Sequence, residues 1–167
     1  MGESVTFANP DRPVVLLIDA HPDVLDRLTQ LLRLEPFELC SATDAAHALA
    51  ILAQQPVDLV MSAARLPDMD GATLLAQIHH DYPHTVRILL TGETDLTLII
   101  KAINEGQIYR YIHKPWDETE LRLTVRQAAE RRQLERERDR LQALTSAQNE
   151  ELKALNTGLE QRVQERT

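Results

Sequence analysis

Short apolar runs alternate with amphipathic segments between Val14 and Asp117. The runs read VVLLI, FELC, DLVMS, VRILL and YRYIH, and each is bounded by Pro, Asp, Thr or Gly. Between them, apolar residues recur every three or four positions, as they do along one face of a helix. The four stripes are Val24, Leu25, Leu28, Leu31 and Leu32; Ala45, Ala48, Leu49 and Leu52; Leu74, Leu75 and Ile78; and Leu96, Ile99, Ile100 and Ile103. The pattern predicts five strands separated by single helices.

Capping signals stand at the expected helix boundaries. His21 and Pro22 suit the cap and first turn of the first helix, and Thr43 can cap the second. Asp117 and Glu120 have the spacing of a capping box at the start of the fifth helix. The helix boundaries that these signals indicate coincide with those that the apolar periodicity indicates.

Strands joined by single helices require right-handed crossovers, which produce a parallel sheet covered by helices on both faces. Sites in such sheets form at the carboxyl ends of the strands. Runs one, three, four and five end at Asp19, Ala63, Thr91 and Lys114. We therefore expect these four residues at one edge of the sheet.

The motifs RLPDMDG, ILLTG and YIHKPW at this spacing resemble the response-regulator receiver domain. The resemblance covers residues 13–130 and implies a doubly wound, flavodoxin-like (βα)5 fold of the α/β class, with parallel strands in the order 2-1-3-4-5. In working receivers, two acids after strand one and a third at the end of strand three hold Mg²⁺. The third acid takes a phosphoryl group from a histidine kinase in the phosphorelay, and a Thr or Ser and a Lys bind the phosphoryl oxygens.

This sequence departs from the receiver pattern at the acids. Thr91, Lys114 and Asp19 are present, but Ala20 and His21 stand where the family commonly has further acids, and Ala63 stands at the phosphoacceptor position. A methyl group cannot act as a nucleophile, and Mg²⁺ requires more oxygen ligands than one carboxylate supplies. The sequence predicts a vestigial phosphorylation pocket with no catalytic residue, no metal site and no cofactor. Lys114 would then contact Asp19; alternatively, Thr91 and Lys114 are remnants of ancestry held by packing.

Tyr111 matches the aromatic side chain that moves between outward and inward positions in switching receivers. Without a phosphoryl group its trigger is missing, because a ligand shifts two states only if it binds them differently. We expect one dominant Tyr111 rotamer, and simple core packing is the alternative. Receivers commonly contact partners through helix four, strand five and helix five, where Leu98 lies off the core stripe and is a candidate contact.

The composition changes after the KPW motif. Residues 117–167 hold no Pro, one Gly, eleven acids and ten bases, which is a composition typical of an exposed helix. A coiled-coil seam can be traced through Leu134, Leu141, Thr145, Gln148, Leu152, Leu155 and Leu159. Residues 131–167 are predicted to be a coiled-coil connector that forms a homodimer, with a frayed monomeric arm as the alternative. Residues 1–12 are predicted to be disordered.

Charge and hydropathy exclude several classes of function. A net charge of −8 argues against direct nucleic-acid binding, which depends on clustered Lys and Arg. One cysteine, Cys40, excludes an internal disulfide framework, and its apolar surroundings favour core packing over reactivity. No apolar run reaches the length of a bilayer span, so we expect a cytoplasmic protein without a membrane partner.

The final stretch, LEQRVQERT, resembles the helical connectors that lead from signalling modules into output domains. A receiver with YRYIHKPW followed by such a helix resembles the N-terminal part of HD-GYP proteins, whose output domain hydrolyses cyclic di-GMP. The uncapped end of the chain suggests a piece of a longer protein. The function predicted is a dimerising, non-enzymatic, non-phosphorylatable regulatory module of a bacterial two-component-type protein. Its partners would be a second copy, its own output domain or an unknown signalling protein.

Two other functions stay open. The chain could be a working phosphoacceptor that uses an unconventional residue, or the receiver of a DNA-binding transcription regulator. Labelling by acetyl phosphate would distinguish the first from a pseudo-receiver.

Overall fold

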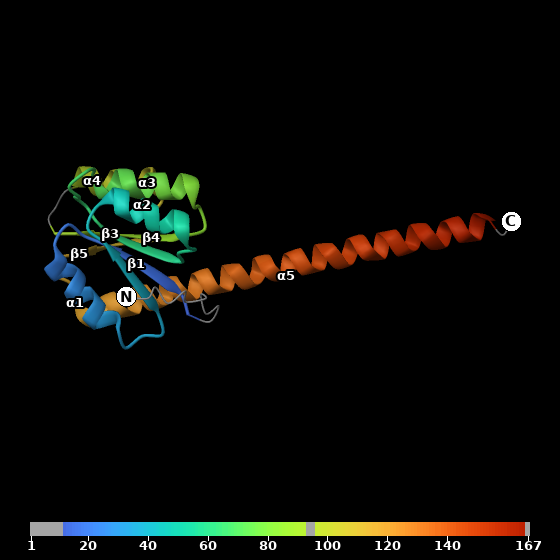
Figure 1. Cartoon of the computed structure of the whole chain (residues 1–167), viewed down its shortest axis with the longest axis horizontal. Helices are drawn as coiled ribbons and strands as arrows, with labels where there is room; N and C mark the ends of the chain where they lie inside the picture. The colour runs from blue at the N-terminus through green and yellow to red at the C-terminus, as the bar shows by residue number, and fades with distance from the viewer. Residues whose placement is uncertain (1–11, 93–95, 166–167) are drawn as a thin grey trace. The chain divides into compact units, whose positions relative to one another are not determined.

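The computed structural model describes residues 12–92 and 96–165, so the predicted disorder of residues 1–12 falls almost entirely outside the described part. Strands and helices alternate strictly along these residues (Figure 1). In order they are β1 (Val14–Ile18), α1 (Pro22–Leu32), β2 (Glu38–Ala42), α2 (Ala45–Gln54), β3 (Leu59–Ala63), α3 (Gly71–Asp81), β4 (Val86–Thr91), α4 (Leu96–Asn104), β5 (Arg110–His113) and α5 (Glu118–Glu165). The predicted alternation of strand and helix is confirmed.

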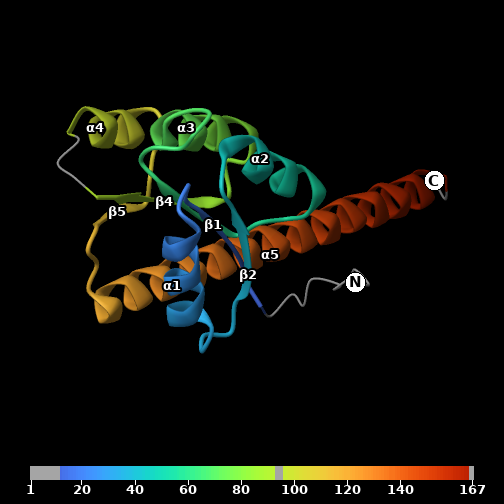
Figure 2. The same ribbon diagram turned by 60° about the vertical axis from the view of Figure 1, so that its left-hand side comes forward.

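The five strands form one parallel sheet in the order β2-β1-β3-β4-β5. Figure 2 shows α2, α3 and α4 on one face of the sheet, with α1 and the first turns of α5 on the other. Alternate residues of β1 enter different cores, since Leu16 packs toward α2 and α3 whereas Leu17 packs toward α1 and α5. Burial on both faces explains why the strand runs are apolar throughout. The predicted flavodoxin-like fold is confirmed.

The prediction that the apolar stripe of α4 faces the core is wrong. Ile99 and Ala102 are buried, and Leu98 packs partly buried against the core, so Leu98 is not the exposed contact that was expected. The other members of the stripe are exposed: Leu96 by 65%, Ile100 by 55% and Ile103 by 47%. Their spacing of four and three residues places them on one helix face, and that face points away from the core. Periodicity reveals such a stripe but not which side of the helix meets the sheet.

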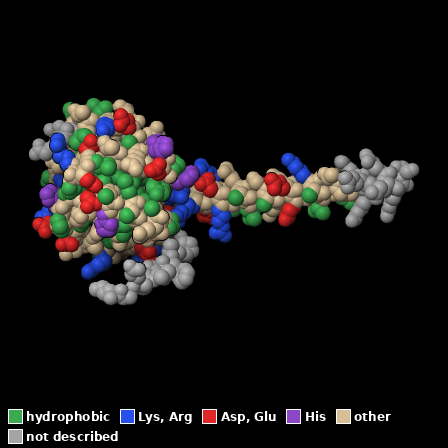
Figure 3. Space-filling view, turned by 45° about the horizontal axis from the view of Figure 1, so that its top comes forward, with side chains coloured by type: hydrophobic (Ala, Val, Ile, Leu, Met, Phe, Trp, Pro, Cys, Tyr) green, Lys and Arg blue, Asp and Glu red, His purple; other side chains and the backbone are tan. Residues whose placement is uncertain are grey.

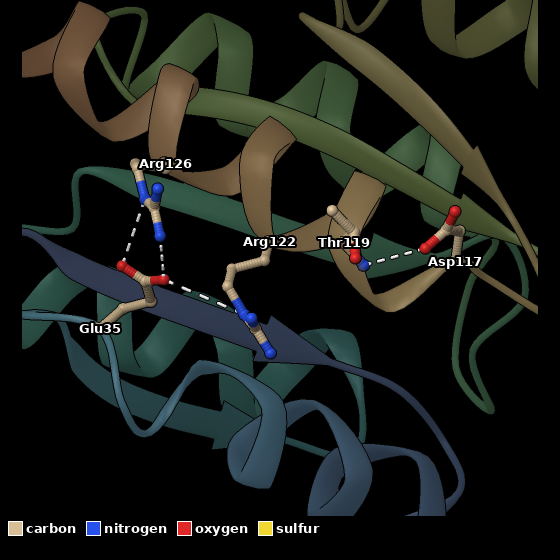
Figure 4. Close-up of polar contacts among 5 residues, drawn as sticks. All are labelled: Glu35, Asp117, Thr119, Arg122 and Arg126. Carbon is tan, nitrogen blue, oxygen red and sulfur yellow. Dashed lines mark hydrogen bonds and ion pairs between the residues drawn. The ribbon is translucent and has the colours of Figure 1, made fainter.

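Two of the predicted caps also differ from the structure. Asp44, not Thr43, caps α2 by accepting a hydrogen bond from the backbone N–H of His47. His21 occupies the N-cap of α1 as expected, but its side chain makes no capping hydrogen bond. Before α5, Asp117 accepts a hydrogen bond from the backbone N–H of Thr119 (Figure 4). Each carboxylate satisfies a helical N–H that has no partner within its helix.

A buried acid lies at the amino-terminal ends of the strands, opposite the carboxyl edge of the sheet. Asp58 precedes β3, and its carboxylate accepts a hydrogen bond from the backbone N–H of Val14 at 2.8 Å. Its own backbone N–H donates to the Val14 carbonyl, and its carbonyl accepts from the backbone N–H of Val86. Its second carboxylate oxygen lies 3.8 Å from Nε of Arg132 on α5. The Asp58 side chain therefore joins the start of β1 to a turn of α5.

The chain divides into two compact units, residues 1–132 and residues 133–167. Residues 133–165 of the second unit are the remainder of α5, and acidic, basic and hydrophobic side chains are interspersed along its described part (Figure 3). The leucines of the predicted seam are more than half exposed here: Leu134, Leu141, Leu152, Leu155 and Leu159. Leu144 is exposed to the same degree and was not assigned to the seam. No helix in the described ranges is both long enough and apolar enough to cross a membrane.

Candidate functional site

A pocket of about 190 Å³ lies at the carboxyl edge of the sheet, where the strand-end residues were expected to meet. Its lining consists of Asp19, His21, Ala63, Ala64, Arg65, Leu90, Thr91, Gly92 and Lys114. The structure thus brings four of the predicted site residues together. Ala20 follows Asp19, is partly buried and is not part of the lining.

Lys114 and Asp19 form an ion pair across this pocket. Nζ of Lys114 lies 2.6 Å from Oδ2 of Asp19, and the predicted contact between them is confirmed. The other carboxylate oxygen of Asp19 accepts a hydrogen bond from the backbone N–H of His21 at 2.9 Å. Asp19 is only 1% exposed and the Lys114 side chain 23% exposed, so the pair is shielded from water mainly on the carboxylate side. Both oxygens of the remaining acid are therefore engaged by the protein.

The end of β3 offers no nucleophile at the phosphoacceptor position. Ala63, whose side chain is a methyl group, is among the residues that line the pocket. Ser62 is buried outside the lining, and its hydroxyl donates a hydrogen bond to the backbone carbonyl of Ala63 at 3.0 Å. Gly71 packs so tightly that a Cβ added there would lie 1.9 Å from that same carbonyl oxygen. The turn after β3 therefore packs closely against the end of the strand. The aspartate that working receivers carry at this strand end is missing.

The acids of the RLPDMDG motif accept hydrogen bonds from the backbone at the starts of helices and do not line the pocket. Asp68 accepts hydrogen bonds from the backbone N–H groups of Ala45 and Ala46, both at 2.9 Å, and these bonds lower its pKa. They attach the loop to the start of α2. This contact could not be predicted from the sequence, because no local spacing relates residue 68 to residues 45 and 46.

Asp70 caps α3 by accepting a hydrogen bond from the backbone N–H of Thr73 at 2.6 Å. Burial acts to raise the pKa of Asp70, but hydrogen bonds from Thr73 and the charge of Lys101 outweigh it, so the pKa is lowered. Nζ of Lys101 lies 3.6 Å from the Asp70 carboxylate and donates to the Thr73 hydroxyl at 2.8 Å. The Asp-x-x-Thr spacing is a capping signal that the sequence analysis did not use.

The side chains that line the pocket do not supply the oxygen ligands that a Mg²⁺ ion needs. Asp19 is its one carboxylate, and both oxygens of that group already accept hydrogen bonds from Lys114 and His21. Magnesium prefers an octahedron of oxygen ligands and is usually held by one or two carboxylates with access to water and phosphate. Within the described ranges, no group of three or more His, Cys, Asp or Glu side chains is placed to hold a metal ion.

Two further residues of the sequence analysis can be placed. Tyr111 is 42% exposed and contacts the ring of His113 edge-on, with 5.5 Å between ring centroids. The alternative of core packing for Tyr111 is therefore wrong, whereas its single rotamer stays a prediction. Cys40 packs partly buried against the core, and burial, together with the charge of Glu38, raises the pKa of its thiol to about 11.

Comparison with known protein families matches residues 15–126 to the response regulator receiver domain. The chain belongs to this family. The receiver is 37% identical over 127 residues to the hydrogenase transcriptional regulatory protein HoxA of Cupriavidus necator, covering 76% of this chain and 26% of that protein. It is 35% identical over 140 residues to the C4-dicarboxylate transport transcriptional regulatory protein DctD of Rhizobium meliloti, covering 84% of this chain and 30% of that protein. The chain thus spans less than a third of the length of these curated relatives.

Two solved structures also resemble the receiver. The signal receiver domain of an HD domain-containing protein from Pseudomonas fluorescens Pf-5 is 60% identical, with a TM-score of 0.74, covering 76% of this chain and 93% of that one. A response regulator receiver domain protein from Clostridium thermocellum is 28% identical, with a TM-score of 0.67, covering 73% of this chain and 98% of that one. Residues 15–126 are accordingly the receiver domain of a two-component regulator.

Proposed function

We propose that this receiver regulates without aspartyl phosphorylation and serves as a fixed platform for protein contacts. The observation that carries the proposal is Ala63 at the phosphoacceptor position, beside a lysine that already pairs with Asp19. In working receivers that lysine binds the arriving phosphoryl group. Here the lysine is already paired with Asp19, and the position of the acceptor is occupied by a methyl side chain.

Acetyl phosphate with Mg²⁺, followed by intact-mass measurement, tests this proposal. The unaltered chain is expected to gain no phosphoryl group, and Ala63→Asp alone is also expected to stay unlabelled, because Ala20 leaves the metal short of a ligand. The double variant Ala20→Asp with Ala63→Asp restores both acids and is the matched positive control. Labelling of the unaltered chain would contradict the proposal and support an unconventional phosphoacceptor.

The proposed partner of the connector is a second copy of the chain. A hollow on α5 is lined by the seam residues Leu134, Leu141 and Thr145, with Glu137, Arg138, Gln142 and Ser146 beside them. Such a hollow is what a side chain of a facing helix fills in a coiled coil. The exposed leucines would stabilise a pair of helices by leaving water, whereas a single helix has no partner surface for them.

The proposed second contact surface is the outward face of α4, β5 and the start of α5. Its exposed apolar side chains are Leu96, Ile100 and Ile103 of α4, Tyr111 of β5 and Leu123 of α5. The grouping of branched apolar side chains on one helix face distinguishes this surface from singly scattered exposed residues. These residues replace Leu98 as the candidate contacts.

Light scattering during size-exclusion chromatography tests the two surfaces separately. Leu141→Asp should convert a connector dimer into a monomer, and Leu144→Asp is its matched control, because the two leucines are 54% and 56% exposed but only Leu141 lies on the seam. Ile100→Asp tests the α4 face, with the 85% exposed loop residue Leu34 as its control site. An unchanged mass for Leu141→Asp in a dimeric protein would contradict the coiled-coil assignment.

The proposed output is an HD-type domain, and for the HD-GYP class this means hydrolysis of cyclic di-GMP. Support comes from the 60% identity to the receiver of an HD domain-containing protein, which exceeds the 37% identity to HoxA. The curated relatives that are transcriptional regulatory proteins support the DNA-binding alternative. The coding sequence that surrounds this segment distinguishes the two: metal-ligand His and Asp motifs support the first, and a helix-turn-helix motif would overturn it.

A further inference from the structure

Another hollow, larger than the vestigial phosphorylation pocket, lies between α1 and α5, on the face of the sheet opposite α3. It has a volume of about 720 Å³ and is lined by Val24, Arg27, Gln30 and Leu31 of α1, Lys114, Pro115 and Trp116 of the following loop, and Glu118 and Arg122 of α5. We call it the α1–α5 pocket. Its volume falls within the range of pockets that hold small organic ligands. Lys114 lines both this pocket and the vestigial phosphorylation pocket.

Two arginines give the α1–α5 pocket available positive charge. Arg27 is exposed and forms no ion pair with any residue that the structure describes. Nε of Arg122 lies 4.0 Å from a Glu35 oxygen, at the limit of an ion pair, whereas Arg126 holds the same carboxylate with two hydrogen bonds of 2.5 and 3.3 Å (Figure 4). Arg122 therefore keeps most of its donor capacity.

The other charged residues of the lining do not cancel the positive charge of the two arginines. The Lys114 ammonium is committed to Asp19 at 2.6 Å, so its charge is already balanced. Glu118 is the acid among the lining residues and offsets one arginine at most. Two arginines and one glutamate leave a net positive charge at the pocket, which favours an anionic ligand.

An apolar wall faces these charges. Trp116 is partly buried against the core and also lines the pocket, together with Val24, Leu31 and Pro115. An indole side chain in such a wall can contact an aromatic ring of a ligand by stacking or edge-on packing. Guanidinium groups bind phosphate oxygens through paired hydrogen bonds. The pocket thus combines a stacking surface with phosphate-binding donors.

We propose that the α1–α5 pocket binds a nucleotide, with the base against Trp116 and the phosphates near Arg27 and Arg122. Inorganic phosphate would engage the arginines but leave the apolar wall in contact with water. The inference stands apart from the proposed function, since it concerns neither the phosphoacceptor position nor the coiled coil.

Trp116 is the chain's single tryptophan, so its fluorescence reports directly on the pocket. Titration of the 167-residue chain with ATP and with GTP should give saturable quenching by at least one of them, after correction for nucleotide absorbance with free N-acetyltryptophanamide. Arg27→Gln and Arg122→Gln should each weaken binding about tenfold, because each removes a charged hydrogen-bonding partner. Arg33→Gln, at the exposed C-cap of α1 and outside the lining, should bind as the unaltered chain does.

Thermal unfolding of each variant checks that the fold is kept, and calorimetry provides a readout independent of fluorescence. Equal affinity for inorganic phosphate would overturn the role assigned to Trp116. Absence of saturation with both nucleotides at millimolar concentration would overturn the proposal, as would binding that survives the Arg27→Gln, Arg122→Gln double substitution.

Discussion

The ion pair between Asp19 and Lys114 predicts an asymmetric pattern of stabilities. Lys114→Met removes the ammonium and leaves Asp19, which is 1% exposed, as a buried carboxylate with one backbone donor. Loss of one partner from a buried pair costs about 3 to 5 kcal/mol, and the 23% exposure of Lys114 places this variant near the lower value. Asp19→Asn keeps an acceptor for the His21 N–H and leaves a lysine that can turn toward water. Its cost should be about 1 to 2 kcal/mol.

Urea unfolding followed by Trp116 fluorescence measures both changes within the receiver unit. The double variant should lose at least about 1 kcal/mol less than the sum of the single variants, because the two residues contact each other. Lys101→Met is the matched control: Lys101 is 35% exposed and lies 3.6 Å from Asp70, so its loss should cost less than about 1 kcal/mol. Single effects that add to within about 0.5 kcal/mol would refute the pair as a stabilising contact.

Three further predictions follow from local geometry. Gly71→Ala should destabilise the receiver by about 3 kcal/mol in urea unfolding, because its Cβ would overlap the backbone carbonyl of Ala63. Gly158→Ala, which meets nothing within 4 Å inside α5, should instead stabilise that helix by about 1 kcal/mol in thermal unfolding followed by circular dichroism. The pKa of Asp70 is lowered on folding, so its contribution to stability is complete above its unfolded pKa of about 3.9 and is lost as pH falls through the lower folded value. Asp70→Asn should therefore flatten the acid limb of the stability curve, and an unchanged limb would count against the capping role.

The strands and the pocket edge could be predicted because each depends on a local pattern. A parallel sheet needs apolar runs of strand length, and its carboxyl edge collects whatever follows those runs. Asp19 and Lys114 are separated by 95 positions in the chain, yet their strand-end positions predicted a shared edge, and the family resemblance then suggested the contact that the structure contains. Strand order came from the family resemblance.

Other features depend on tertiary packing that no local pattern records. The α4 stripe shows this clearly, since Ile99 enters the core while Ile100, with the same hydrophobicity, faces outward. Asp68 contacts a helix that begins 23 positions earlier. The α1–α5 pocket likewise joins residues near 27 and near 122, whose proximity follows only once two helices share a face of the sheet.

The raised pKa of Cys40 has a practical consequence for spectroscopy. A thiol with a pKa of about 11 holds about a hundredfold less thiolate at neutral pH than one at the ordinary value of 9.0, and the thiolate is the species that reacts with maleimides. Ser146→Cys, on the exposed surface of α5, would therefore react with a spin label or fluorophore well before Cys40. Distances between paired labels could then be measured on the unaltered receiver background, without first replacing its native cysteine.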